Sequence, residues 1–167
     1  MDGIISALPY SDQKIREIIA AFKYSFAETL AERLSALLIQ EMKNLGLSGY
    51  FAEFKIIPVP LHSRRLNWRG FNQSLLLSKP LSRMLNVEIQ TELVKRDRFT
   101  KPQIELKKEQ RRQNIQGAFS ITNPSQISGR YLLVDDVVTT GSTLNEIAKL
   151  LKQSGASEVW AMTLAHG

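Results

Sequence analysis

Apolar residues recur every three or four positions along the first long segment of the chain, which is typical of one face of a helix. They are Ile15, Ile18, Ile19, Phe22, Phe26, Leu30, Leu34, Leu37, Leu38 and Met42. Ser11 or Asp12 can cap the start of this helix, and Gly46 follows its end. The stretch is long for a single globular helix, so the pattern is compatible with a break near residues 24–25. We interpret the apolar face as core packing.

Shorter apolar segments follow and alternate with further helical patterns. Residues 54–60 are apolar, β-branched and closed by proline, as in a buried strand. The strands expected on such grounds are residues 54–60, 87–94, 117–121, 130–134 and 159–164. Helices are expected over residues 72–85, where Pro80 should kink or split the helix, and over residues 142–153, before Gly155.

Strands that alternate with crossover helices predict an α/β fold with a mostly parallel central sheet and helices on both faces. In such sheets, ligands bind at the carboxyl ends of the strands. The 167 residues are a one-domain length. We expect a single domain over residues 1–167, with a helical N-terminal part (1–49) and a core (50–167).

Composition narrows the chemistry that this domain can perform. Cysteine is absent and only two histidines are present, which excludes disulfides, thiolate zinc sites and histidine-rich metal sites. Any metal should be an oxygen-bound ion such as Mg²⁺. The formal net charge of +6 indicates an anionic partner. No apolar run approaches the ~20 residues of a membrane span, and residues 1–10 do not resemble a signal peptide, so we expect a cytoplasmic protein.

The segment from residue 131 to residue 143 carries the clearest chemical pattern. A buried strand runs into two acids and a Thr/Gly/Ser loop, and a helix follows. Unpaired N–H groups at a helix N-terminus attract anions, Gly141 lets the backbone approach a phosphate, and the hydroxyls can donate further hydrogen bonds. The predicted phosphate-binding residues are Val137, Val138, Thr139, Thr140, Gly141, Ser142 and Thr143. The spacing is not that of the Walker P-loop.

Asp135 and Asp136 would repel a phosphate that touched them, so they suit sugar hydroxyls better. Either carboxylate could also hold Mg²⁺, directly or through water. The whole segment therefore fits a ribose 5-phosphate. The plainer alternative, in which the acids end a strand and the Gly-Ser pair begins a helix, does not explain why all four parts occur together.

This segment resembles the ribose-phosphate signature of type I phosphoribosyltransferases. Over about residues 8–165, the chain is similar to the ComF (competence protein F) family. The blocks that carry this wider resemblance are residues 21–24, 57–62, 69–73 and 110–119. The resemblance implies a type I phosphoribosyltransferase-like fold that binds phosphoribosyl pyrophosphate with Mg²⁺ and transfers ribose 5-phosphate to a nitrogen acceptor, as in nucleoside metabolism.

The resemblance also assigns roles to two basic segments. A pyrophosphate-binding loop would comprise Leu61, His62, Ser63, Arg64 and Arg65. A flexible loop over residues 95–112 would close over the site, and its test residues are Arg96, Arg98, Gln103, Arg111 and Arg112. From charge alone, both segments could equally be solvated surface. Arg69 could face the phosphate site, and we expect Trp68 and Phe71 in the core rather than as a nucleobase platform.

In the implied reaction, Asp135 and Asp136 are the catalytic residues, which orient the ribose and stabilise an oxocarbenium-like transition state. Two other functions stay open: a competence-related accessory protein that binds single-stranded DNA, and a non-catalytic phosphoribosyl pyrophosphate sensor. A homodimer is compatible with each of them. The chain departs from many ComF relatives in lacking a four-cysteine zinc module. Only residues 1–49 could form a hood over an acceptor, so the acceptor stays undetermined.

Overall fold

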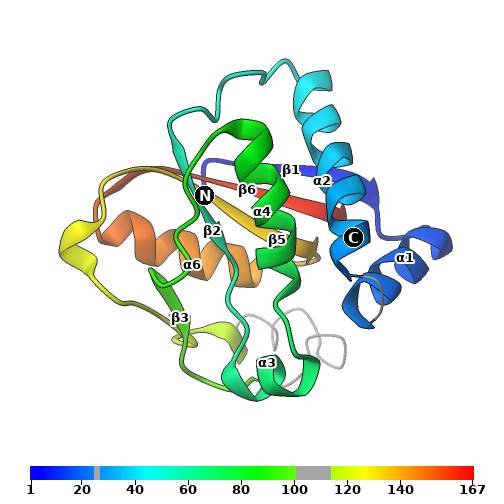
Figure 1. Cartoon of the computed structure of the whole chain (residues 1–167). Coiled ribbons are helices and arrows are strands. Elements are labelled where there is room, and N and C mark those ends of the chain that lie inside the picture. Colours follow the sequence, from blue (N-terminus) through cyan, green and yellow to red (C-terminus); the bar gives the residue numbers. More distant parts are fainter. Residues whose placement is uncertain (25–26, 101–113) are drawn as a thin grey trace.

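A four-stranded parallel sheet forms the centre of the molecule (Figure 1). The computed structural model describes residues 1–24, 27–100 and 114–167. The strands lie in the order β1, β6, β5, β2. Their bounds are β1 Gly3–Pro9, β2 Phe54–Pro58, β5 Gly129–Val138 and β6 Ala156–His166. The predicted α/β class with a mostly parallel sheet is confirmed.

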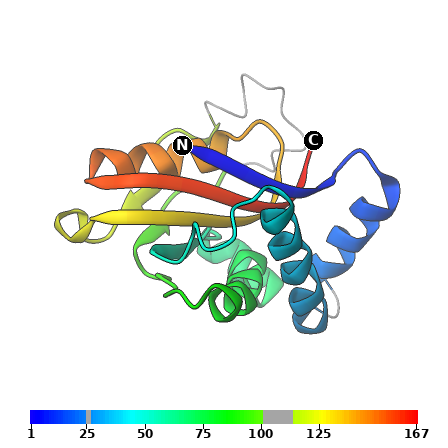
Figure 2. The ribbon, with the colours of Figure 1, turned by 90° about the horizontal axis from the view of Figure 1, so that it is seen from above.

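Helices cover both faces of this sheet, as Figure 2 shows along its edge. The helices are α1 Gln13–Tyr24, α2 Ala27–Asn44, α3 Ser63–Arg69, α4 Gln73–Leu85 and α6 Ser142–Gln153. One core cluster joins α2 and α4 to the sheet through residues such as Leu38 and Leu77. The other core cluster joins α6 to the opposite face through residues such as Ile147 and Leu151. A short antiparallel pair, β3 Val94–Arg96 and β4 Phe119–Ile121, packs with α6.

Several local predictions are confirmed at the ends of helices. The Asp12 side chain accepts a hydrogen bond from the Lys14 amide, at the start of α1. The long apolar segment forms two helices, since α1 ends at Tyr24 and α2 begins at Ala27. Gly46 follows α2 with a φ of +72°. Pro80, in contrast, does not split its helix, because α4 continues through it to Leu85.

The predicted strand over residues 87–94 is wrong. Ile89 makes a single parallel bridge with Ile56, through backbone hydrogen bonds of Ile56 with Glu88 and Gln90. The chain then leaves the main sheet, and strand geometry resumes only at Val94, which pairs with β4 instead. The apolar residues of this segment are therefore divided between two sheets.

The strand β1 lies inside the N-terminal part that we expected to be helical. It pairs with β6 on one side only, with Ile5 buried at 1% exposure and Ile4 exposed at 40%. Gly3 lies against the indole ring of Trp160, where an added Cβ would come within 2.4 Å of a ring carbon. Glycine at this position therefore lets β1 approach its neighbour.

All four strands point their carboxyl ends toward the same edge of the sheet, because they are parallel. The residues that follow β1, β2 and β5 consequently meet there, as the rule for open α/β sheets predicts. Among the described residues, no helix combines the length and the apolar character that crossing a membrane requires.

Candidate active site

The acids and the predicted phosphate loop stand at the carboxyl end of β5. Asp135 and Asp136 belong to the strand itself, which reaches Val138 before the chain turns into α6. Gly141 adopts a φ of +70°, and a Cβ there would lie 3.1 Å from the side chain of Asn145. The hydroxyls of Thr140 and Ser142 are 2.8 Å apart. This turn encloses a small hollow of about 20 Å³ at the N-terminus of α6, the geometry that favours an anion.

A larger cavity of about 210 Å³ adjoins this turn. Its lining comes from four stretches of the chain: residue 10, residues 59–74, residue 96 and residues 135–143. The lining residues are Tyr10, Val59, Leu61, Arg65, Arg69, Gln73, Ser74, Arg96, Asp135, Asp136, Val137, Thr139 and Thr143. Three arginines and two aspartates thus share one cavity with hydroxyl groups, although they are far apart in the sequence.

The arginines form a cationic wall. Thr100 is buried at 3% exposure and links two of them: its carbonyl oxygen accepts from Arg65 Nη2 at 3.0 Å, and its hydroxyl lies 2.6 Å from Arg96 Nη2. Burial, and then the neighbouring Arg69, lower the pKa of Arg65. Burial and the charge of Arg65 lower the pKa of Arg96 to about 10, against the opposite effect of Asp135. Neighbouring guanidinium groups repel one another, which disfavours their charged forms. A polyanionic ligand would offset this repulsion.

The opposite wall is acidic and held by hydrogen bonds. Asp135 Oδ1 accepts from the Ser74 hydroxyl at 3.0 Å and from the Asp136 amide at 2.9 Å. Asp136 Oδ1 accepts from the Val137 amide at 2.7 Å. Both carboxylates are therefore fixed in orientation at the edge of the cavity.

Only part of the predicted pyrophosphate loop lines the cavity. Leu61 and Arg65 line the cavity, whereas the other three residues of the segment do not. His62 caps α3 by accepting a hydrogen bond from the Arg64 amide at 3.2 Å, and its carbonyl oxygen accepts from the Arg65 amide. Since the Arg64 and Arg65 amides are engaged at the start of α3, Arg65 offers the cavity its side chain rather than its backbone N–H.

The two described residues of the predicted flexible loop also differ in their relation to the cavity. Arg96 lines the cavity, whereas Arg98 donates to the carbonyl oxygens of Asn114 and Gln116. Gln103, Arg111 and Arg112 lie outside the described residues. Arg69, which we expected as one alternative, does line the cavity.

The expectation that Trp68 packs in the core is wrong, because its side chain is 72% exposed on α3. Sequence reasoning also missed Tyr10, Gln73 and Ser74 as cavity residues. Gln73 belongs to one of the blocks that carried the family resemblance, so a signal existed for it. Tyr10 follows a strand that the hydrophobic pattern did not reveal, and nothing in its neighbourhood indicated a site.

Among the described residues, no group of three or more histidines, aspartates and glutamates is placed to hold a metal ion by itself. Asp135 and Asp136 nevertheless supply the oxygen donors that Mg²⁺ takes when it keeps several waters and shares a phosphorylated substrate. The donor set therefore fits Mg²⁺ brought with a ligand.

Comparisons with known proteins show which family this chain resembles. Residues 72–167 match the family described as "Phosphoribosyl transferase domain". The chain is 43% identical to the DNA utilization protein YhgH of Escherichia coli O157:H7, over 87% of this chain and 65% of that protein. It is 47% identical to the competence protein F of Haemophilus influenzae, over 66% of this chain and 49% of that protein.

The chain thus spans less than two thirds of the length of these curated relatives. The resemblance to the ComF family is confirmed by the similarity to competence protein F. A solved structure, the purine phosphoribosyltransferase of Pyrococcus horikoshii Ot3, aligns with all of this chain and 89% of its own, at 18% identity and a TM-score of 0.40.

Proposed function

The chain belongs to the phosphoribosyl transferase domain family, and on that premise we propose that it binds phosphoribosyl pyrophosphate with Mg²⁺ and transfers ribose 5-phosphate to a nitrogen acceptor. The observation that carries this proposal is the arrangement of charge in the 210 Å³ cavity. Three arginines line it together with two aspartates, and a loop with the shape of a phosphate cradle adjoins it.

Phosphoribosyl pyrophosphate has anionic groups at both ends and hydroxyls between them. The cradle at the N-terminus of α6 suits the 5-phosphate, because backbone amides and hydroxyls there can donate to it. Asp135 and Asp136 suit the ribose hydroxyls as hydrogen-bond acceptors. Arg65, Arg69 and Arg96 suit the diphosphate, since guanidinium groups bind phosphate oxygens in pairs.

In the proposed reaction, the bond between the anomeric carbon and the diphosphate oxygen breaks, and a bond from that carbon to the acceptor nitrogen forms. The diphosphate leaves with the electron pair of the broken bond, and the nitrogen loses a proton to solvent. Asp135 and Asp136 would orient the ribose and stabilise positive charge on the ring, and the arginines would stabilise the leaving diphosphate. Bound Mg²⁺ would add further neutralisation of the diphosphate.

Calorimetric titration with phosphoribosyl pyrophosphate, with and without Mg²⁺, tests this proposal. We expect binding that Mg²⁺ strengthens and that the Asp135→Asn, Asp136→Asn double variant loses while still folding. Glu53→Gln is the matched control, because this exposed carboxylate lies at the other end of β5, where it pairs with Arg130. An absence of binding under both conditions refutes the enzyme and the sensor together.

A screen of bases and amines for pyrophosphate release then separates enzyme from sensor. Release that depends on an added acceptor supports transfer, and its loss in the double aspartate variant supports the assigned residues. Binding without release by any acceptor favours the sensor. Full turnover in the double variant refutes the mechanism.

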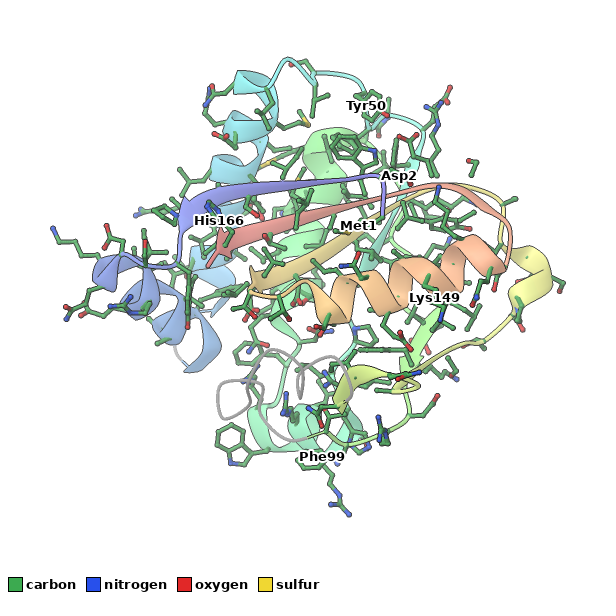
Figure 3. All side chains as sticks on the ribbon, turned by 180° about the vertical axis from the view of Figure 1, so that it is seen from behind. Met1, Asp2, Tyr50, Phe99, Lys149 and His166 are labelled. Carbon is green, nitrogen blue, oxygen red and sulfur yellow. The ribbon has the colours of Figure 1, made fainter. Side chains whose placement is uncertain are left out.

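An exposed aromatic surface favours binding of single-stranded DNA as a second candidate function. Trp68 and Phe99 are 72% and 46% exposed, and the Arg64 guanidinium lies 5.5 Å from the centre of the Phe99 ring. Arg64 and Trp68 are four residues apart on α3, hence on one face, and Phe99 lies beside α3 at the edge of the molecule (Figure 3). Exposed rings between cations provide the stacking and phosphate contacts that single strands use.

A fluorescently labelled oligothymidylate titrated at several salt concentrations tests this second function. We expect Trp68→Ala to weaken binding by about 5- to 150-fold, the range of one lost base stack of ~1–3 kcal/mol. Asp135→Asn should leave DNA affinity unchanged. If Trp68→Ala has no effect and Asp135→Asn abolishes binding, the aromatic surface is not the DNA site.

A further inference from the structure

The first turn of α4 contacts both walls of the cavity through two adjacent side chains. Gln73 Oε1 accepts a hydrogen bond from Arg69 Nη1 at 2.7 Å, on the cationic wall. The Ser74 hydroxyl donates to Asp135 Oδ1 at 3.0 Å, on the acidic wall. Gln73 and Ser74 are 2% and 3% exposed. Two consecutive buried polar residues thus connect oppositely charged groups that the proposed function assigns to different parts of one ligand.

The backbone that carries these side chains is anchored to the residue that follows β2 and, through it, to β5. Asn72 caps α4, since its Oδ1 accepts from the Ser74 amide at 3.0 Å and its Nδ2 donates to the Val59 carbonyl at 3.1 Å. The Val59 amide in turn donates to Val134 of β5 at 2.9 Å. The turn is therefore held against the same strand that presents Asp135, which fixes the hydroxyl relative to the carboxylate.

A buried hydroxyl directed at a carboxylate oxygen restricts the orientation of that carboxylate, and such charge-assisted bonds are about twice as strong as neutral ones. A buried amide oxygen on a guanidinium likewise fixes the plane of the guanidinium, and the plane determines which phosphate oxygens it can bind in pairs. Groups held by such neighbours need no reorganisation when a ligand arrives.

We propose that Ser74 and Gln73 are positioning residues for the two halves of the ligand, an inference that rests on the proposed function. Ser74 orients Asp135 toward the ribose hydroxyls. Gln73 orients Arg69 toward the diphosphate. Neither residue needs to touch the reacting atoms, so each acts through the residue that it contacts.

The test separates the two halves by using ribose 5-phosphate and inorganic pyrophosphate with Mg²⁺ as independent calorimetric probes on the full chain. Ser74→Ala should weaken ribose 5-phosphate binding by about tenfold, the effect of ~1.4 kcal/mol for a lost bond to a charged group, and leave pyrophosphate binding near wild type. Gln73→Met should show the reverse selectivity. Ser74→Thr, which restores a hydroxyl, should recover ribose 5-phosphate binding.

Ser78→Ala is the matched control for Ser74→Ala. Ser78 lies one turn further along α4, is fully buried, and donates its hydroxyl to the Ser74 carbonyl oxygen at 2.7 Å. It is not among the residues that line the cavity. The control variant should lose stability as any buried hydroxyl deletion does, without changing the ratio of the two affinities.

The outcomes distinguish this inference from the function on which it rests. If the wild-type chain binds phosphoribosyl pyrophosphate but Ser74→Ala and Ser78→Ala weaken both probes equally, the positioning role is refuted and the function stands. The same holds if Gln73→Met and Ser74→Ala show the same selectivity. If the wild-type chain binds neither probe nor phosphoribosyl pyrophosphate, both the function and the positioning role are refuted.

Discussion

Replacing Arg96 with methionine should stabilise the fold while it weakens ligand binding. The guanidinium lies in a partly buried position near a like charge, and burial together with Arg65 lowers its pKa to about 10. At neutral pH the folded chain therefore holds a cation in an environment that disfavours it. Methionine fills a similar volume and carries no charge.

The size of this effect follows from the pKa. Lowering the pKa of Arg96 from its ordinary value to about 10 corresponds to about 3 kcal/mol at pH 7, since one pKa unit is worth about 1.36 kcal/mol. Residual solvent screening reduces this value. The variant also loses the hydrogen bond to Thr100, worth about 1 kcal/mol, and the contact with the Phe119 ring, worth about 0.5 kcal/mol. The expected net gain is about 1 kcal/mol, which raises Tm by about 2–4 °C.

Thermal unfolding followed by circular dichroism at pH 7 measures this gain, and calorimetry measures the loss of phosphoribosyl pyrophosphate binding. Arg98→Met is the control: this exposed arginine donates to two backbone carbonyls, so its replacement should lower Tm slightly and leave ligand affinity intact. A drop in Tm for Arg96→Met as large as that for Arg98→Met, or an unchanged ligand affinity, would refute the reasoning.

Further predictions concern pH, the cationic wall and one turn. Because the pKa of Arg96 is lower in the folded chain than in the unfolded chain, the stability difference between Arg96→Met and wild type should be complete below pH about 10. It should shrink as the pH rises above that value, which denaturation at each pH measures. Arg65→Met should weaken calorimetric pyrophosphate binding at least tenfold, whereas its neighbour variant Arg64→Met should not, because only Arg65 lines the cavity. Gly155→Ala should lower the free energy of unfolding by about 1–3 kcal/mol, because φ is +113° and an added Cβ would lie 2.9 Å from a carbonyl oxygen. Gly46→Ala, also at positive φ but with open space around it, should cost less in the same urea titration.

The sequence allowed the buried parts of the fold to be predicted because burial leaves a local pattern. The strands predicted over residues 54–60, 130–134 and 159–164 are nearly continuous apolar runs, and they correspond to β2, β5 and β6. Asn72 and Gly155 marked the ends of helices for equally local reasons, namely a capping side chain and a positive φ. Such features depend on a few neighbouring residues and need no knowledge of the tertiary structure.

The helix α3 shows why other elements escaped prediction. It has no buried residue, so no apolar period marks it. It is defined by its two ends instead: His62 caps the start, and Gly70, with a φ of +82°, donates its amide to Leu66 at the end. Strand β1 was hidden for a related reason, since an edge strand buries only part of its surface.

The candidate site likewise contains residues whose place could be predicted from the sequence and a contact that could not. Asp135 and Asp136 are adjacent in the sequence and follow a strand, so their place at the sheet edge could be predicted. The contact between Ser74 and Asp135 joins residues 61 positions apart, and only the packing of α4 against β5 creates it. Local sequence patterns contain no information about such a contact.

The cationic wall connects these observations. Its arginines come from α3, which has no core of its own, and from β3, a three-residue strand outside the main sheet. The pattern of apolar residues therefore predicts neither α3 nor β3. The wall also holds half-buried cations beside one another, an arrangement that disfavours their charge: burial first, and then a neighbouring arginine, lower the pKa values of Arg65 and Arg96. Natural folds tolerate such costs chiefly where function requires them. A cluster of arginines that packing alone would not select is thus itself an argument that a polyanion binds there.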